Sequence, residues 1–564
     1  MSNIYLRLLA TLCLLLLTHW VSAAEVTIVG LAKREEQNFR SYLVAYQSSG
    51  VLNIKQSQLN GIVDKALNPY GYYHAAAKLD ASNPGKVIIE VEPGQQTILA
   101  NVDITLSGQA RADQDFINVV QDFAPHAGEA LDHGRYDEIK SSLQALAQAK
   151  GYFDNQFTEA RLEVIPSQNA ANIMLHFDSG RRYQFGDIHL HGNQIETSRL
   201  LNLRTFDKGD DFAINQLAEY QARLSSSGWF KSAHVTLGES DANHLIPVDV
   251  ELVPMSKQVV SVGGGYSSNT GLRGALNWSQ PWYNERGHSF ESKLAVSAPE
   301  QSLKLGYKIP TRDVLDGYYA VRFEAKHVDY LDTKSLNGNL GFEKHWRLDN
   351  DWQSTFYVRY LYEDYQQSLQ HNKTQLMMPG VSFSYQPSSQ SQHSVKHTHQ
   401  YALEYAEPYL LSDVRALRLT GESQMSWKID EKNKISARLG LGANLGVDVT
   451  NLPSSLRFFA GGESSIRGYQ YSSISPKDES GGLIGGQYLA TLGVDYQTKI
   501  YKSFWGGFLY DVGDAYDSAP IWKQGAGISL EWDSRVLPVK LSIARPFHSS
   551  IDEWRMHLSL GTTF

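Results

Sequence analysis

The chain has 564 residues, of which 42% are hydrophobic and 20% charged. This is the composition of an ordinary folded protein, and the length predicts two or more folded units. The formal net charge of −9 and the lack of a basic stripe with interleaved aromatic residues disfavour nucleic acid as a partner.

Residues 1–23 have the pattern of a secretory signal peptide. Arg7 precedes an apolar run from Leu8 to Leu17, and small residues follow at Val21-Ser22-Ala23-Ala24, so we expect cleavage after residue 23 or 24. A retained membrane anchor is the alternative. The only cysteine, Cys13, lies in this run, so the exported chain is expected to have no disulfide, no Cys-ligated zinc and no iron–sulfur cluster.

Three units of similar pattern follow, at residues 24–97, 98–182 and 183–256. Each contains a glycine followed by two aromatic residues, at Gly71-Tyr72-Tyr73, Gly151-Tyr152-Phe153 and Gly228-Trp229-Phe230. An amphipathic helix pattern precedes each triplet, and a strand pattern opens and closes each unit. Each unit is therefore expected to be a small sheet packed under helices. Chance recurrence within one large α/β domain is the alternative.

From residue 257 to residue 564 the pattern changes to short alternating segments separated by turns. Past residue 25 no apolar run approaches the roughly 20 residues of a membrane-spanning helix. Eleven candidate strands lie between residues 258 and 450, and five more begin near Gly485, Phe504, Gly525, Val539 and Trp554. The total of sixteen predicts an antiparallel transmembrane β-barrel. A soluble β-sandwich would explain the alternation but not its extent.

A long polar loop, at about residues 456–484, separates the eleventh predicted strand from the twelfth. It contains Arg467, and the strands that follow carry Asp495 and Asp511 at positions facing away from their apolar faces. A buried guanidinium needs such carboxylates, with which it can form paired hydrogen bonds. The two acids are therefore candidate partners of Arg467. An ordinary solvated loop arginine is the alternative.

No motif indicates catalysis. The sequence lacks a G-x-S-x-G elbow, an H-E-x-x-H helix and a Walker-type phosphate loop. The histidines His393, His397 and His399 have no acids at suitable spacing and are interpreted as solvated. We therefore predict no enzymatic activity, no catalytic residue, no cofactor and no metal site.

Taken together, these patterns resemble the superfamily of outer-membrane barrel-assembly proteins and two-partner-secretion transporters. The resemblance rests on three sheet-and-helix repeats, a barrel that ends in phenylalanine, and a Gly-Gly…Ile-Arg-Gly-Tyr loop before the last five strands. The repeats resemble POTRA domains. Their number, three, resembles the TamA family, the outer-membrane subunit of the translocation and assembly module. The fold implied is three α+β periplasmic POTRA-like domains followed by a 16-stranded barrel in the cell outer membrane.

The resemblance also implies roles for the loop residues. In this superfamily the loop folds back into the barrel lumen, and acids on the inner wall hold the arginine of its tip. Carried to this chain, Arg467, Gly468 and Tyr469 form the tip, and Asp495 and Asp511 are the acids. The expected arrangement is a latch.

Glycines mark the two strands expected to close the barrel. The first strand carries Gly263, Gly264 and Gly265, and the last carries Gly561 and ends at Phe564. Successive glycines weaken strand packing. Relief of crowding in a curved barrel would explain them equally well, but the resemblance favours a lateral seam whose opened edges could pair with a client strand.

The implied function is an assembly factor that helps insert or translocate β-barrel and autotransporter proteins. The implied partners are a TamB-like, inner-membrane-anchored periplasmic protein, unfolded outer-membrane protein or autotransporter clients, and outer-membrane lipid. One alternative is phospholipid transport to the outer membrane with the same partner. The other is a two-partner-secretion pore, for which two repeats and usually a plug helix would be expected.

Overall fold

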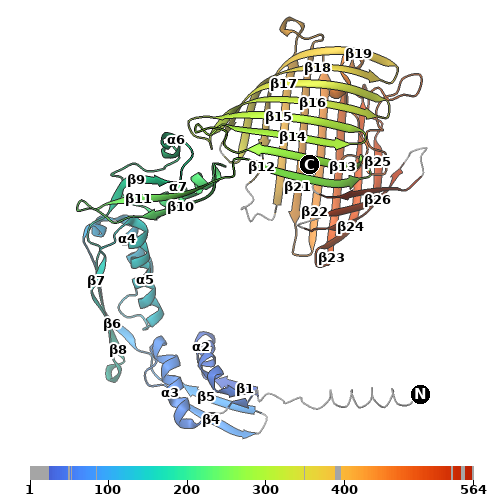
Figure 1. The fold of residues 1–564 in the computed structure, drawn as a ribbon. Coiled ribbons are helices and arrows are strands. Elements are labelled where there is room, and N and C mark those ends of the chain that lie inside the picture. The colour runs from blue at the N-terminus through green and yellow to red at the C-terminus, as the bar shows by residue number, and fades with distance from the viewer. Residues whose placement is uncertain are drawn as a thin grey trace, which may run out of the picture. The chain divides into compact units, whose positions relative to one another are not determined.

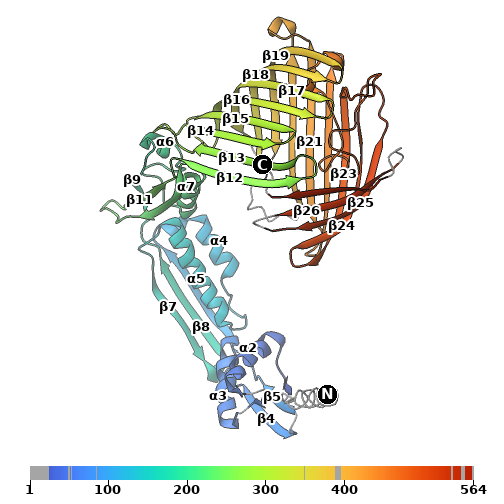
Figure 2. The ribbon, with the colours of Figure 1, turned by 45° about the vertical axis from the view of Figure 1, so that its right-hand side comes forward.

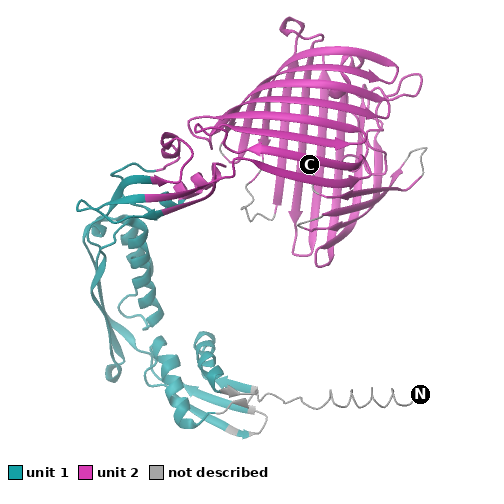
Figure 3. Ribbon diagram, in the orientation of Figure 1, with its two compact units in different colours: residues 1–189, 206–218, 236–248 teal, residues 190–205, 219–235, 249–564 magenta. Residues whose placement is uncertain are grey.

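The computed structural model describes residues 25–48, 51–52, 54–83, 86–348, 350–385, 387, 395–534, 538–547 and 553–561. The predicted signal peptide and Phe564 lie outside the described residues. The chain divides into two compact units (Figure 3). One comprises residues 1–189, 206–218 and 236–248, and the other comprises residues 190–205, 219–235 and 249–564.

The first sheet-and-helix group has three main strands and two helices (Figure 1). They are β1 (Glu25–Val29), α2 (Lys33–Leu43), α3 (Gln56–Leu67), β4 (Ala76–Asn83) and β5 (Lys86–Glu92), with a short pair β2 (Gln47–Ser48) and β3 (Val51–Leu52). The sheet order is β1-β5-β4, with β1 parallel to β5. Leu59, Val63 and Leu67 of α3 recur at helical spacing and are fully buried, so one apolar face seals this core.

The second group repeats this topology. Its elements are β6 (Ile98–Ser107), α4 (Gln114–Phe123), α5 (His133–Lys150), β7 (Gln156–Ile165) and β8 (Ala170–Asp178). The order is β6-β8-β7, with β6 parallel to β8. The Asp132 side chain caps α5 by accepting a hydrogen bond from the Gly134 amide, and Gly151 ends the helix. A polar cap marks the start of a helix, and a glycine at its C-terminus marks the end.

The third group consists of β9 (Gln184–His191), α6 (Thr197–Leu201), α7 (Ile214–Ser226), β10 (Phe230–Leu237) and β11 (Leu245–Pro254), in the order β10-β11-β9. The division between the two compact units passes through this sheet. The repeated glycines Gly71, Gly151 and Gly228 share a backbone role, because their φ angles are 84°, 82° and 77°. Glycine is favoured in this left-handed conformation, which explains why the triplet recurs after each helix.

Sixteen strands form a closed antiparallel barrel (Figures 1 and 2), which confirms the predicted number and the division into eleven plus five. The strands are β12 (Val259–Ser267), β13 (Gly271–Gln280), β14 (Ser289–Ser297), β15 (Glu300–Pro310), β16 (Gly317–Tyr330), β17 (Thr333–Arg347), β18 (Trp352–Gln367), β19 (Gln370–Tyr385), β20 (Val395–Ala406), β21 (Ala416–Lys428), β22 (Asn433–Leu445), β23 (Tyr488–Tyr501), β24 (Phe504–Tyr516), β25 (Lys523–Trp532), β26 (Val539–Phe547) and β27 (Arg555–Leu560).

The barrel wall alternates as the sequence pattern predicts. On β24, Phe508 and Tyr510 are 69% and 44% exposed, whereas Leu509 and Asp511 between and after them are 3% and 0% exposed. The two aromatic side chains therefore face outward, and Leu509 and the Asp511 carboxylate face inward, the arrangement of a membrane barrel. Across the described residues, no helix is both long and apolar enough to cross a membrane.

Candidate functional site

The segment between β22 and β23, residues 446–487, crosses the interior of the barrel. Gln470 Nε2 donates to the Tyr330 hydroxyl of β16 at 3.2 Å, while the Arg467 side chain reaches Asp511 of β24. These strands are eight positions apart in the closed order, on opposite sides of a sixteen-stranded barrel. A segment that contacts both walls must lie across the lumen, and we call residues 446–487 the lumen loop.

Arg467 lies at the tip of the lumen loop and is 5% exposed. Its Nε and Nη2 donate to Asp511 at 2.7 and 2.8 Å, and its Nη1 and Nη2 donate to Asp495 at 2.6 and 3.0 Å. The Arg467 backbone amide adds a bond of 2.9 Å to Asp511. One guanidinium thus joins β23 and β24 through two-point, charge-assisted hydrogen bonds.

Two glycines allow the tip to approach the wall closely. A Cβ atom at Gly525 of β25 would lie 1.9 Å from the Arg467 carbonyl oxygen, and one at Gly468 would lie 3.0 Å from the Arg545 carbonyl carbon of β26. Gly468 also has φ of +95°, which a side chain rarely tolerates. Tyr469, the third tip residue, is buried beside them. The structure therefore brings together all five residues named for this site from the sequence.

The cluster contains a second arginine, Arg438, which had not been predicted from the sequence. Arg438 of β22 donates through Nη2 to Asp511 at 3.1 Å and through Nη1 to the Glu463 carbonyl oxygen at 2.9 Å. Asp511 therefore accepts from two guanidinium groups and one backbone amide. Arg438 occupies the lumen-facing position between outward residues of β22, so strand alternation was a signal that could have found it.

The base of the lumen loop has a separate attachment on β18. The carboxylate of Glu363 is fully buried and accepts from the Ser454 hydroxyl at 2.5 Å, from the Ser455 amide at 3.2 Å and from the Ser455 hydroxyl. A buried carboxylate requires such donors, since leaving it without them is strongly unfavourable. No motif in the sequence identified Glu363.

Arg457 closes the base of the lumen loop on itself. The residue is 4% exposed, and its guanidinium donates to the carbonyl oxygens of Leu452, Ile484 and Thr450 at 2.9, 2.9 and 3.0 Å. It also donates to Gln370 Oε1 of β19 at 2.9 Å. The two ends of the lumen loop are therefore held to one cation and to the barrel wall.

The barrel closes through few residues. Among the described residues β12 and β27 are register partners at Tyr266 with Leu560 and at Ser267 with Ser559, and the Ser268 amide just beyond β12 donates to the Leu558 carbonyl oxygen at 2.8 Å. By contrast, β12 pairs with β13 along its full length. A Cβ atom at Gly265 would lie 2.4 Å from the Leu560 carbonyl oxygen. Glycine at this position therefore permits a close approach across the seam, the name used here for the β12–β27 junction.

The seam glycines differ in their positions. Gly561 lies one residue beyond β27, not within it as expected, with φ of +97°, and its Cβ would lie 2.7 Å from the Gly264 carbonyl oxygen. All three glycines of β12 pair with β13, and Gly263 lies opposite Ala275. Gly264, Gly265 and Gly561 thus meet at the seam. Phe564 lies outside the described residues.

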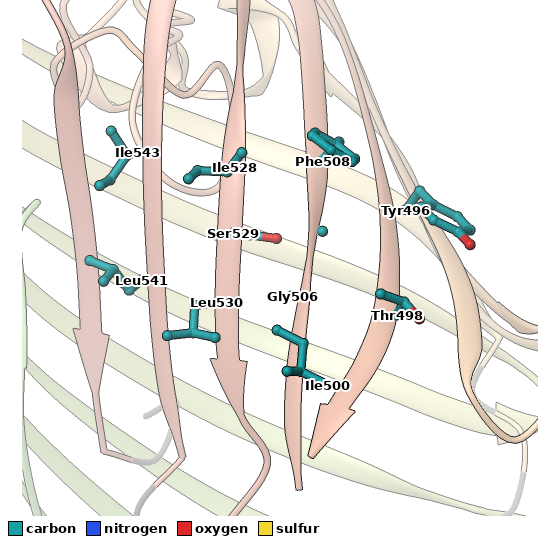
Figure 4. A pocket seen from close by; sticks show the side chains of 11 residues that line it. Tyr496, Thr498, Ile500, Gly506, Phe508, Ile528, Ser529, Leu530, Leu541 and Ile543 are labelled. Carbon is teal, nitrogen blue, oxygen red and sulfur yellow. The ribbon is translucent and has the colours of Figure 1, made fainter. Parts of the chain in front are cut away.

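An apolar groove lies on the outer face of β23 to β26 (Figure 4). It has a cavity volume of about 410 Å³. Gly506 occupies an outward position between Phe504 and Phe508, and the missing side chain opens the groove. The remaining walls are mainly aliphatic and aromatic, from Tyr496, Thr498, Ile500, Gly507, Ile528, Ser529, Leu530, Leu541 and Ile543.

The histidines of β20 form no metal centre in the described part of the chain. His397 Nδ1 lies 3.0 Å from His399 Nε2, and His399 Nδ1 lies 3.0 Å from the Ser423 hydroxyl. His393 lies outside the described residues. No group of three or more metal-ligating side chains is found among the residues that are described.

Two family models match this chain. One, described as the Omp85 superfamily domain, matches residues 257–564, and the other, described as POTRA domain TamA domain 1, matches residues 25–93. The first match covers the whole barrel, and the second covers the first sheet-and-helix group.

Known proteins with similar sequence or structure include assembly factors. Outer membrane protein assembly factor BamA of Nitratidesulfovibrio vulgaris is 29% identical over 157 residues, which are 25% of this chain and only 20% of that protein. BamA from Haemophilus ducreyi lacking POTRA domains 1–3 aligns with a TM-score of 0.70 at 15% identity, covering 83% of this chain and 100% of that one. CdiB from Acinetobacter baumannii aligns over 94% of this chain and 99% of its own at 13% identity, with a TM-score of 0.46.

Proposed function

Because this chain belongs to the Omp85 superfamily, with its barrel in the outer membrane and its N-terminal domains in the periplasm, we propose that it helps insert or translocate β-barrel and autotransporter proteins. The supporting observation is the seam, where β12 and β27 pair at two positions among the described residues. A strand edge with unpaired hydrogen-bonding groups can add a strand from another chain. The short seam is the place for a client strand to enter.

Within the superfamily we propose the TamA branch. The match of residues 25–93 to a TamA-type POTRA model and the three sheet-and-helix groups support it, with POTRA-like domains at 24–97, 98–182 and 183–256. A two-partner-secretion pore, by contrast, would be expected to have two. A TamB-like, inner-membrane-anchored protein is the proposed partner. Edge strands such as β4 and β7 offer it strand addition.

A disulfide across the seam tests the proposal. Tyr266 and Leu560 are register partners, so cysteines there meet the distance that a disulfide requires. The only natural cysteine is Cys13, in the predicted signal peptide. In proteoliposomes the oxidised pair should block insertion of an autotransporter barrel, and reduction should restore it.

The matched control is a cysteine pair at Ile309 and Tyr319, which are register partners on β15 and β16, away from the seam. This pair also joins an aromatic position to an aliphatic one. Its oxidation should leave insertion unchanged. Undiminished insertion through the barrel locked at Tyr266 and Leu560 would refute the seam mechanism.

Lipid transport is a second candidate, supported by the outer groove of Figure 4. Its apolar lining suits an acyl chain, because apolar surface is stabilised by contact with hydrocarbon. Depletion of the protein separates the candidates, since loss of barrel proteins supports insertion and loss of lipid asymmetry supports transport. Gly506→Leu fills the groove, so it should reduce lipid transfer and leave client insertion unchanged. Normal lipid transfer by this variant would show that the groove does not carry lipid.

A further inference from the structure

His557 connects the lumen loop to the strand that closes the barrel. It lies on β27, is 2% exposed, and its Nε2 accepts a hydrogen bond of 3.0 Å from the backbone amide of Gly468. Gly468 directly follows Arg467 at the tip of the lumen loop. The last strand of the seam therefore bonds directly to the loop tip, from inside the barrel.

The Gly468 N–H, as the hydrogen-bond donor, determines the protonation state of the His557 imidazole. A backbone N–H can only donate, so Nε2 must be unprotonated, and the neutral ring carries its proton on Nδ1. A leucine of similar size could not accept this bond. A glutamine could, through its amide oxygen.

Through its tip and through Glu463 just before the tip, the lumen loop contacts every strand from β22 to the seam. Arg438 belongs to β22, Asp495 to β23 and Asp511 to β24. Beyond them the Gly525 backbone of β25 and the Arg545 backbone of β26 lie against the tip. His557 extends this series to β27. The lumen loop therefore contacts six consecutive strands, the last of which is one edge of the seam.

The seam itself supplies little pairing to hold that edge. Among the described residues, β12 and β27 have two register pairs, and Ser268 just beyond β12 adds a bond of 2.8 Å to the Leu558 carbonyl oxygen. These pairings are fewer than the nine between β12 and β13, so fewer ladder hydrogen bonds oppose separation of β27 from β12. The Gly468 amide is buried at its bond to His557, and separating the two would leave a buried donor without a partner, which is unfavourable. Contact with the loop tip thus opposes movement of β27 from within.

We propose that His557 is a positioning residue that couples the lumen loop to the seam. While the loop tip is seated, the bond from Gly468 to His557 holds β27 against β12. When the tip withdraws, β27 loses this inner support and the seam opens. The inference rests on the proposed function, for which it names the regulatory contact.

A single reporter cysteine measures the opening. Ser267 is a seam residue paired with Ser559 and is 4% exposed, so a cysteine there reacts with a maleimide only when the seam opens. In the full chain with Ser267→Cys, we expect His557→Leu to raise the labelling rate by about tenfold, the scale of one lost hydrogen bond. His557→Gln, which keeps an acceptor, should restore a rate near that of the unmodified histidine.

The labelling experiment includes two further variants, one as a control and one as a second test. His345→Leu makes the same substitution on β17, where His345 bonds to Glu343 and Thr355, and should leave labelling unchanged. Gly468→Ala retains His557 but adds a Cβ atom that would lie 3.0 Å from the Arg545 backbone, and it should raise labelling by displacing the tip. This variant also tests the coupling if His557→Leu does not fold.

Equal labelling of His557→Leu and the parent would overturn the coupling, and so would an increase that glutamine fails to reverse. If His557→Leu does not fold, unchanged labelling of Gly468→Ala would overturn it instead. Labelling is measured without a client. A barrel that never inserts a client could still show the coupling, and a barrel that inserts normally could lack it, so the two claims fail separately.

Discussion

Arg467 illustrates how much of this barrel depends on guanidinium geometry. The planar group offers a pair of N–H donors to Asp511 and another to Asp495, and Nη2 serves both acids. A lysine ammonium retains the charge but cannot reproduce two flat, two-point contacts. We therefore propose that the site acts as a latch, in which the charge and its shape both hold the loop tip.

The latch predicts an order among substitutions. Arg467→Ala leaves the buried carboxylate of Asp511 and the partly buried carboxylate of Asp495 with fewer donors, and removing one partner of a buried ion pair typically costs about 3–5 kcal/mol. Arg467→Lys should be milder, because one charge-assisted contact can remain. The temperature at which the barrel loses its compact migration on SDS gels should fall most for alanine and less for lysine.

Arg415→Ala is the matched control. Arg415 makes a comparable two-point contact with Glu407 at 2.7 and 3.0 Å, but its side chain is 62% exposed. Solvent-exposed ion pairs contribute little to stability, so this variant should migrate like the parent. Wild-type behaviour of both Arg467 variants, in migration and in client assembly, would eliminate the latch.

Glu363 is predicted to retain the base of the lumen loop. Glu363→Gln keeps the size of the side chain but points an NH₂ group at donors, and the Ser455 amide cannot reorient to accept. Such a mismatch costs about 1–3 kcal/mol in a buried site. Protease cleavage within residues 446–487 should therefore become faster. Glu300→Gln, which alters a more exposed pair with Lys326, is the control, and equal cleavage in both variants would contradict an anchoring role.

Among the elements outside the barrel, helix α4 depends on a charged cap. Asp113 caps it and accepts from Lys150 Nζ at 2.7 and 2.9 Å. Burial alone would raise the pKa of Asp113, but hydrogen bonds from Lys150 and the Asp115 amide outweigh it and lower the pKa. Burial likewise would lower the pKa of Lys150, but its bonds to Asp113 and Asp115 raise it.

The signs of these shifts predict a pH window for α4. The folded pKa of Asp113 lies below its unfolded value of about 3.9, so its contribution is present above that value and is lost in more acidic solution. The contribution of Lys150 is present below about pH 10.4 and is lost in more alkaline solution. Hydrogen exchange of α4 in the full chain, corrected for intrinsic rates, should show less protection at pH 3.5 than at pH 7.

Asp113→Asn should reduce both the protection at pH 7 and its change with pH. Glu163→Gln, which alters an exposed carboxylate on β7, should behave like the parent. If the Asp113→Asn variant retained the full pH response, another group would be responsible for it.

For the whole molecule, the strand count predicts sidedness. The periplasmic domains lead into β12, and sixteen antiparallel strands alternate in direction, so the turn after the ninth strand, β20, faces the cell exterior. Tyr409 in that turn is 92% exposed, and Tyr409→Cys should react with an impermeant maleimide on intact cells. Lys502→Cys, in the turn after the twelfth strand, should react only after lysis. Labelling of both on intact cells would contradict this topology.

The sequence by itself determined the features that local periodicity encodes. Alternation gave the sixteen strands, and it placed Asp495 and Asp511 on the lumen side, because side chains of a strand point to opposite faces in turn. Helical spacing and recurring glycines likewise indicated the three sheet-and-helix groups. Each of these features depends on residues within one short segment.

Only the tertiary structure decided which distant residues meet. The partners of the lumen loop on β18, β22 and β27, namely Glu363, Arg438 and His557, come from segments far apart in the chain, and their meeting depends on the path of the loop through the closed barrel. The position of Gly561 beyond β27 and the pairing of β12 with β27 depend equally on how the first and last strands meet. Alternation gives the face of a residue, whereas barrel closure sets the register between the strands at its ends.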